Sequence, residues 1–196
     1  MKSLTRPDNL FRTLAILSLA IGLAGCGKTA GEYRRDSQMM QPSMTLWQAV
    51  DALAQQIPFT RGNVESVLST HLVEKDTSKN PIQNTTFKFY TSGPVRLSDG
   101  VVISNVDLRV RYKAGHPGFL VLNLEGSCIG IEQVRSHYSD LKLTYPPRPD
   151  SKDAFTGYST FPSWGKLSFS FLEKNPGCLS SLVFDPKPVE ADNATK

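Results

Sequence analysis

The chain has 196 residues, of which 39% are hydrophobic, with 22 basic and 18 acidic side chains and a formal net charge of +4. The basic excess is small for this length, and neither a long Lys/Arg run nor zinc-finger spacing adds to it, so the composition argues against nucleic-acid binding. No apolar stretch reaches the length of about 20 residues that a membrane-spanning helix needs.

The N-terminal segment has three parts in the order of an export signal. Three basic residues precede an uncharged apolar stretch from Thr13 to Leu23. The sequence Leu23-Ala24-Gly25-Cys26 then resembles a bacterial lipobox. The resemblance implies that a signal peptide over residues 1–25 is removed. Cys26 would become the new N-terminus and carry acyl chains such as palmitate into the membrane.

Residues 22–29 also satisfy the phosphate-loop pattern G-x-x-x-x-G-K-[ST] in full. A phosphate loop needs a following helix whose N-terminus points at the anion. Residues 30–38 contain an early glycine, Gly31, and no apolar stripe, so nothing would dock such a helix. The sequence therefore favours the lipobox and predicts no nucleotide partner, with an uncleaved membrane anchor as the third interpretation.

Removal of residues 1–25 takes away three of the 22 basic side chains and one of the 18 acidic ones. The mature chain then keeps 19 basic and 17 acidic groups, so its net charge is about +2. Gly27, rather than an aspartate, follows Cys26, which resembles lipoproteins that pass to the outer membrane. We expect a lipid-anchored protein on the periplasmic face of the outer membrane, and the inner membrane stays open as an alternative.

Two cysteines remain once Cys26 is assigned to lipid. Cys128 and Cys178 form an even count in a compartment that permits disulfides, and we predict that they pair. Closing a loop of about 50 residues would stabilise the fold by about 4 kcal/mol on the chain-entropy model. Two buried free thiols are the alternative, and neither cysteine has a further ligand at zinc spacing.

A flexible tether is expected over residues 26–43, a single α+β domain over 44–185 and a disordered tail over 186–196. The domain opens with a helix whose apolar residues repeat at helical spacing: Leu46, Val50, Leu53 and Ile57. Pro58 ends this helix. A second helix is capped by Thr60 or Asn63, and it too has an apolar face: Val64, Val67, Leu68 and Leu72.

After about residue 84 the apolar period changes to two, which predicts half-buried strands. The predicted strands are residues 85–90, 106–112, 120–124, 128–134, 167–171 and 178–184. Short turn signals separate several of them, so antiparallel pairing is expected. The predicted fold class is α+β, with two N-terminal helices packed on an antiparallel, mostly meandering β-sheet and one disulfide.

The order of tether, paired helices and strands, with the second-helix sequence Phe59-Thr60-Arg61-Gly62-Asn63-Val64-Glu65-Ser66-Val67-Leu68, resembles a known architecture. It is similar to small outer-membrane lipoproteins of the SmpA/BamE type and to the related β-lactamase-inhibitor-like fold. The resemblance covers roughly residues 44–125. The C-terminal third with the two cysteines has no counterpart, and the family's glycine-proline after the second helix is absent.

The three histidines do not predict a catalytic set. His71 lies near the end of the second helix, where a cation favours the helix dipole, and His116 lies in a turn. Ser136 to Asp140 gathers hydroxyls, His137 and a carboxylate, but neighbouring residues of a strand point to opposite faces. Neither G-x-S-x-G nor H-E-x-x-H occurs. We therefore expect no enzyme, no catalytic residue, no metal and no cofactor, with a small envelope hydrolase as the least favoured alternative.

A proline-stiffened loop, Tyr145-Pro146-Pro147-Arg148-Pro149, precedes a segment that is rich in aromatic residues. Tyrosine, tryptophan and arginine dominate interface hot spots, because they bury area at a low cost in entropy and keep a polar group. The residues predicted to bind a partner are Tyr145, Arg148, Tyr158 and Trp164. Two other aromatic residues of the segment, Phe155 and Phe161, are expected in the core.

The sequence thus favours a membrane-anchored protein that faces the periplasm and binds another protein. The leading hypothesis is an inhibitor or immunity protein against an envelope-active enzyme or toxin, because an anchor places such a protein where its target acts. The alternative is a structural accessory subunit of an outer-membrane assembly or secretion machine.

Overall fold

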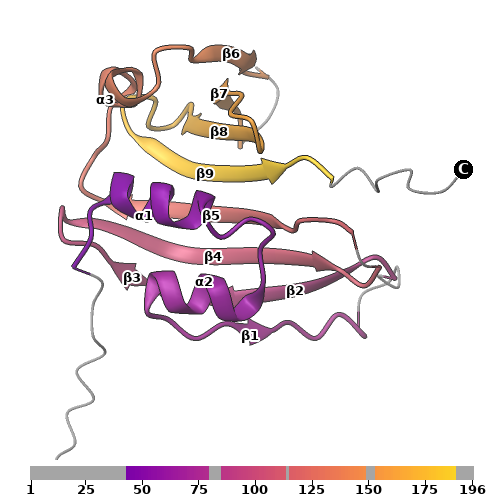
Figure 1. The fold of residues 1–196 in the computed structure, drawn as a ribbon. Coiled ribbons are helices and arrows are strands. Elements are labelled where there is room, and N and C mark those ends of the chain that lie inside the picture. Colours follow the sequence, from indigo (N-terminus) through magenta and orange to yellow (C-terminus); the bar gives the residue numbers. More distant parts are fainter. Residues whose placement is uncertain (1–42, 80–84, 114, 149–152, 189–196) are drawn as a thin grey trace, which may run out of the picture. The chain divides into compact units, whose positions relative to one another are not determined.

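The computed structural model describes residues 43–79, 85–113, 115–148 and 153–188 (Figure 1). The predicted signal peptide, the lipidation site Cys26 and the tether up to residue 42 lie outside the described residues. No helix of the described segments is long and apolar enough to cross a membrane.

Antiparallel strands dominate the described chain and pair into one large sheet. The strands are β1 (Val73–Glu74), β2 (Phe87–Ser92), β3 (Val95–Arg96), β4 (Val101–Arg111), β5 (Phe119–Gly126), β6 (Lys142–Tyr145), β7 (Phe155–Thr160), β8 (Gly165–Leu172) and β9 (Leu179–Pro186). Their order is β1-β2-β4-β5-β9-β8-β7-β6, and β3 pairs with β4. The last strand in the chain, β9, therefore lies between β5 and β8 and joins the two halves of the sheet.

Three short helices accompany the sheet in the described part of the chain. They are α1 (Leu46–Ala54), α2 (Arg61–Leu68) and α3 (Ile131–His137). A capping box starts α1, because the Thr45 hydroxyl accepts from the Gln48 N–H and the Gln48 side chain accepts from the Thr45 N–H. Thr60 caps α2 by accepting from the Asn63 N–H. Both helices lie over the same face of the sheet (Figure 1).

The predicted fold class is wrong. The described chain is mostly one large antiparallel sheet with three short helices, rather than a helix pair packed on a meander. The sheet is not a meander, because β5 pairs with β9 and the intervening strands fold back on the far side of β9. Helix α1 has nine residues and α2 eight, so the sheet rather than the helices determines the architecture.

The strand predicted over residues 128–134 is also wrong, because most of that segment belongs to α3. Gly130 begins the helix, and the Gln133 side chain accepts its N–H at 2.8 Å. Val134 is fully buried and Ile131 packs beside the core, a spacing of three that suits a helix and not a strand. Arg135 pairs with Glu132 one turn earlier and supports the helix further.

The predicted disulfide is confirmed. Cys128 and Cys178 are bonded, with Cα atoms 5.0 Å apart and a separation of 50 residues in sequence. The bond ties the loop between β5 and α3 to the turn before β9. The Leu179 N–H donates to the Ile129 carbonyl beside it, so the two segments are held together by backbone as well.

The core lies between the helices and one face of the sheet. Its largest fully buried side chains come from helices α1 and α2 and from the central strands: Leu46, Leu53, Leu68, Leu108, Leu120, Leu122, Leu167, Phe169, Leu182 and Phe184. The prediction that Phe155 and Phe161 lie in the core is wrong, because 39% and 51% of their surfaces are exposed. Both lie at the ends of β7, where the sheet approaches its edge.

Candidate functional site

A row of aromatic and charged side chains crosses the face of the sheet opposite to the core. In register, Phe89 of β2 pairs with Arg109 of β4, and Arg109 pairs with Phe119 of β5. Asp185 of β9 and Lys166 of β8 continue this face on the far side of β5. We call these five residues the cross-strand row. Four strand spacings of about 4.8 Å make it about 19 Å long.

Arg109 lies between two phenylalanine rings of this row. Its guanidinium carbon is 5.7 Å from the Phe89 ring centre and 5.3 Å from the Phe119 ring centre, and both are cation–π contacts. The same guanidinium donates to the Asp107 carboxylate at 2.6 Å. Three contacts therefore fix a flat, half-exposed guanidinium between two apolar surfaces.

Lys166 fixes the other half of the row. Its ammonium donates to the Tyr145 hydroxyl at 3.2 Å and lies 3.2 Å from the Asp185 carboxylate. Burial lowers the pKa of Lys166, but the hydrogen bonds to Tyr145 and Asp185 outweigh burial and raise it above its ordinary value. The lysine is therefore held as a cation, and the side chain of Tyr145 extends over the face of the sheet from β6.

Three cavities follow the cross-strand row. The first, of about 310 Å³, is lined by Phe87, Phe89, Arg109, His116, Phe119 and Asp185. The second, of about 320 Å³, shares Phe119 and Asp185 with the first and adds residues of the later strands, among them Tyr145, Phe155 and Lys166. The third, of about 540 Å³, shares Tyr145 and Phe155 with the second. We call the three together the open-face groove.

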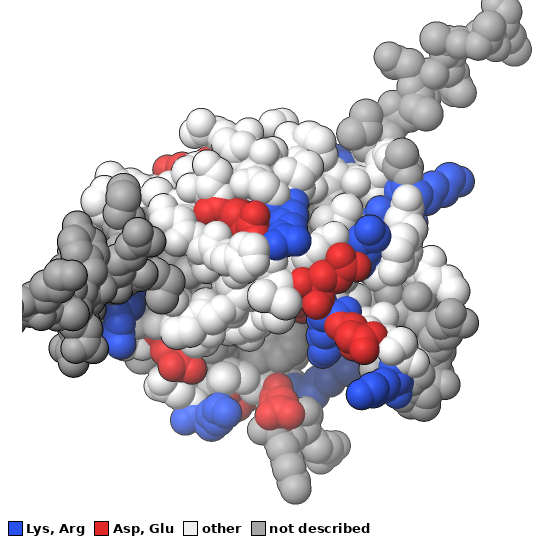
Figure 2. All heavy atoms as spheres, turned by 90° about the horizontal axis from the view of Figure 1, so that it is seen from below, with Lys and Arg blue, Asp and Glu red and all other residues white. Residues whose placement is uncertain are grey.

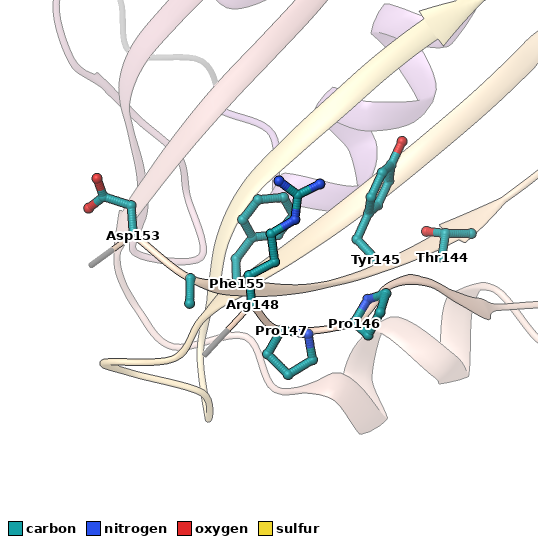
Figure 3. Close-up of a pocket in the computed structure, with 8 residues that line it drawn as sticks. Thr144, Tyr145, Pro146, Pro147, Arg148, Asp153 and Phe155 are labelled. Atoms are coloured by element: carbon teal, nitrogen blue, oxygen red, sulfur yellow. The ribbon is translucent and has the colours of Figure 1, made fainter. Parts of the chain in front are cut away.

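The described part of the proline-stiffened loop, residues 145–148, forms one end of the open-face groove. The third cavity is lined by Thr144 to Arg148 and by Asp153 to Phe155. Figure 3 shows the side chains of Tyr145, Arg148 and Phe155 projecting to the same side of the loop. Tyr145 and Phe155 are 43% and 39% exposed, and their rings lie 6.1 Å apart. Two of the predicted partner-binding residues, Tyr145 and Arg148, therefore lie together.

The other two predicted partner-binding residues lie elsewhere. Tyr158 is half-buried on the core side of β7, where its ring meets Phe171 edge-on at 6.0 Å. Trp164 is half-buried and stacks on Phe184 at 5.9 Å. Neither residue lines any of the three cavities of the groove. The structure thus separates the four predicted residues into a groove pair and a core pair.

Hydroxyl side chains hold the loop strand β6 against the rest of the sheet. The Thr144 and Ser159 hydroxyls lie 2.7 Å apart, and the Ser159 and Ser168 hydroxyls 2.8 Å apart. Ser159 and Ser168 are buried, and each has its hydrogen bond within this chain of hydroxyls. The chain joins β6, β7 and β8, so it positions Tyr145 over the groove.

The histidines lie in three different places. His71 is exposed, with its Nδ1 3.2 Å from the Glu65 carboxylate. His116 is in the first cavity and accepts the Gly118 N–H through Nδ1, while burial and then Arg111 lower its pKa. His137 ends α3 and its ring lies 4.1 Å from that of Trp47. The segment Ser136 to Asp140 therefore spans the end of α3 and the turn that follows it.

Charges of both signs are mixed on the side of the protein that Figure 2 shows. Basic and acidic side chains lie next to one another there, and no patch of one sign covers that side. Among the described residues, no group of three or more His, Cys, Asp or Glu could hold a metal ion.

The sequence predicts none of the cross-strand row as a site. The sequence pattern that contains the row's arginine is that of β4, in which Asp107, Arg109 and Arg111 alternate with apolar residues. Such alternation predicts only a half-buried strand with a polar outer face. The aromatic partners Phe89 and Phe119 lie on other strands, and only the register between strands brings them next to Arg109.

Comparisons with protein-family models, with curated proteins and with solved structures gave no match for this chain. The resemblance to SmpA/BamE-type lipoproteins therefore stays a prediction from the sequence. The function must be inferred from the open-face groove and from the N-terminal signal.

Proposed function

We propose that this protein is a membrane-anchored binding module that holds a partner protein in the open-face groove. Cys26 would carry the lipid, and the body would face the periplasm from the outer membrane. The role that best fits an anchored module is inhibition of, or immunity against, an envelope-active enzyme or toxin. The three lipoprotein parts of the N-terminal sequence support the anchor, and the groove supports the binding.

The observation that carries the proposal is the continuity of the groove. Small-molecule sites are usually one enclosed pocket of about 300–1,000 Å³. Here three cavities join end to end through shared residues, and half-buried or exposed aromatic rings lie at intervals along them. A long, shallow and aromatic surface with fixed charges has the anatomy of a protein interface, in which buried rings give affinity and polar groups give orientation.

The charged groups of the groove suit binding better than proton transfer. A general base must be able to give up its proton near the working pH. Lys166 is held in its protonated form by Tyr145 and Asp185, and Arg109 is permanently charged. Fixed cations beside aromatic rings orient a bound partner without taking part in chemistry. This supports a binding role over the alternative of a small envelope hydrolase.

The anchor has its own test. Cys26→Ala should abolish acylation and move the protein from the membrane fraction to the soluble periplasmic fraction, because acylation requires the cysteine side chain. Fractionation with labelled palmitate measures both effects. Continued membrane association of an unlabelled Cys26→Ala protein would contradict the lipobox and favour an uncleaved anchor.

The binding role is tested with two matched pairs of substitutions. Tyr145→Ser with Phe155→Ser removes the rings that line two of the three cavities. Leu143→Ser with Phe161→Ser is the control, because these residues are 56% and 51% exposed on neighbouring segments and line none of the groove. All four side chains are exposed enough that both pairs should fold.

Each variant is crosslinked in intact envelopes and purified through a C-terminal tag. The groove pair should lose a stoichiometric envelope protein by about 30-fold or more, since removal of interface anchors costs about 2 kcal/mol or more. The control pair should retain that protein. Equal retention by both pairs, or no specific partner with the wild type, would refute the groove as a binding surface.

A further inference from the structure

One arginine lies beside the first cavity of the open-face groove, and another lines the cavity at the loop end. Arg111 lies at the β2–β4 end with its guanidinium carbon 5.3 Å from the Phe87 ring centre. Arg148 lines the cavity at the loop end. Both are exposed, and neither has a carboxylate partner within ion-pair distance among the described residues. Between them, Arg109 and Lys166 are each already paired with an aspartate.

Basic groups thus lie toward both ends of the groove, with Asp153 in the same cavity as Arg148, and aromatic rings lie between the two ends. The two carboxylates of the cross-strand region, Asp107 and Asp185, are neutralised by Arg109 and Lys166. Arg111 and Arg148 thus have donors available for an incoming group. A guanidinium presents a planar fork of donors that matches a carboxylate in two-point contact.

The length of the groove limits the ligand. From β4, which ends at Arg111, to β6, which ends three residues before Arg148, the sheet has five strand spacings, or about 24 Å across the strands. An extended polypeptide advances by about 3.3 Å per residue, and about seven residues would cover this distance. A helix would need about 16 residues for the same distance and is about 10 Å wide, which fits a shallow groove less well.

The aromatic rings between the two ends of the groove favour a peptide over a glycan. Phe89, Phe119 and Phe155 offer ring surfaces without donors or acceptors. Of the polar side chains between them, Lys166 and Asp185 are already bonded to one another and Ser168 is bonded to Ser159, while Ser170 also lines the second cavity. Sugar hydroxyls buried against the rings without a partner would lose their hydrogen bonds to water, whereas apolar side chains would gain from contact with the rings.

We propose that the open-face groove receives an extended, acidic segment of the partner protein, whose carboxylates bind Arg111 and Arg148 and whose apolar side chains lie on the rings between them. This inference rests on the proposed function, because it specifies the partner surface of the same groove. Attraction between the acidic segment and the two arginines would also orient the partner along the groove.

The test uses the full-length acylated chain in detergent micelles and a defined probe, fluorescent poly(Glu,Tyr). Binding is followed by fluorescence anisotropy at two salt concentrations. Arg111→Gln with Arg148→Gln is the test pair, and Arg96→Gln with Arg135→Gln is the control pair, because Arg96 lies on β3 and Arg135 on α3, two elements that contribute no residue to the groove lining. Two exposed charge-assisted contacts predict a loss of about tenfold for the test pair, and less than twofold for the control.

Three further measurements complete the test. Arg111→Lys with Arg148→Lys should recover part of the binding, because the charge is kept while the planar fork is lost. Poly(Lys,Tyr) should not bind. Equal affinity of the test pair and the wild type for poly(Glu,Tyr), or tighter binding of a chitin tetrasaccharide than of poly(Glu,Tyr), would overturn the acidic-segment proposal.

The outcomes also separate this proposal from the proposed function. If Tyr145→Ser with Phe155→Ser loses the envelope partner while the arginine pair keeps both partner and probe, the binding module stands and the acidic segment is wrong. If none of these substitutions changes partner capture, both proposals fail.

Discussion

Removal of the Cys128–Cys178 disulfide should lower stability by an amount that follows from its position. The bond closes a loop whose ends are 50 residues apart and which contains α3, β6, β7 and β8. On the chain-entropy model, releasing such a loop costs about 4 kcal/mol, because the reduced unfolded chain gains conformations that the bond forbids. For a folded unit of this size, that loss corresponds to a fall of about 8–16 °C in Tm.

The assay is urea unfolding of the same protein with and without reductant, followed by circular dichroism. With a slope of about 2 kcal/mol per molar urea, the midpoint should fall by about 2 M on reduction. The Cys128→Ser/Cys178→Ser protein should match the reduced wild type and should not respond to reductant. An unchanged midpoint on reduction, or a change in slope alone, would refute the reasoning.

Three further predictions concern the core residue Phe169, the contact between Gly157 and the Tyr145 ring, and the loss of stability at acid pH. Phe169→Ala should destabilise the fold by about 3–5 kcal/mol in urea unfolding, because the ring is fully buried beside Trp47; a loss below 1 kcal/mol would contradict this packing. Gly157→Ala should weaken partner capture with little loss of stability, because an added Cβ would lie 2.9 Å from the Tyr145 ring and displace it; unchanged capture would place that ring outside the interface. Backbone donation from Leu72, and then Arg61, lowers the pKa of Glu65 below 4.5. Its carboxylate therefore adds stability above pH 4.5 that is lost as the pH falls through the folded-state pKa. Glu65→Gln should flatten the stability curve on that acid side, and an unchanged slope would count against the contact.

Local patterns in the sequence predict the individual helices and strands better than they predict the order of the strands in the sheet. The apolar stripe through Leu46 and Leu53 predicts α1, and the proline and cap residues near Thr60 predict where α2 begins. These signals depend on residues a few positions apart. The position of β9 between β5 and β8 depends on pairing over long distances in the chain, which no local period encodes.

Two local irregularities also limit the prediction. The register of β4 shifts between Ile103 and Asn105, so Ile103 and Val106 face the core although their numbers have opposite parity. A strict period of two therefore predicts β4 only from residue 106 onward. In α3, the alternation of Ile129 and Ile131 imitates a strand, while the burial of Val134 follows a helix.

The candidate site is only partly visible in the sequence, for a related reason. Tyr145 and Arg148 stand out because prolines separate them and their residue types favour interfaces. Phe119 and Lys166 do not stand out, because a single aromatic or basic residue on a half-buried strand is common. Their role depends on the neighbours that sheet register gives them, Arg109 for Phe119 and Asp185 for Lys166.

Site-specific photocrosslinking in living cells tests the central claim most directly. p-Benzoylphenylalanine replaces Phe155, which lines two cavities of the open-face groove, or Phe161, which is similarly exposed and lines none of them. A binding module of the proposed kind gives one dominant crosslinked envelope protein from position 155 and none from position 161. The same products from both positions, or no product from position 155, would contradict the account.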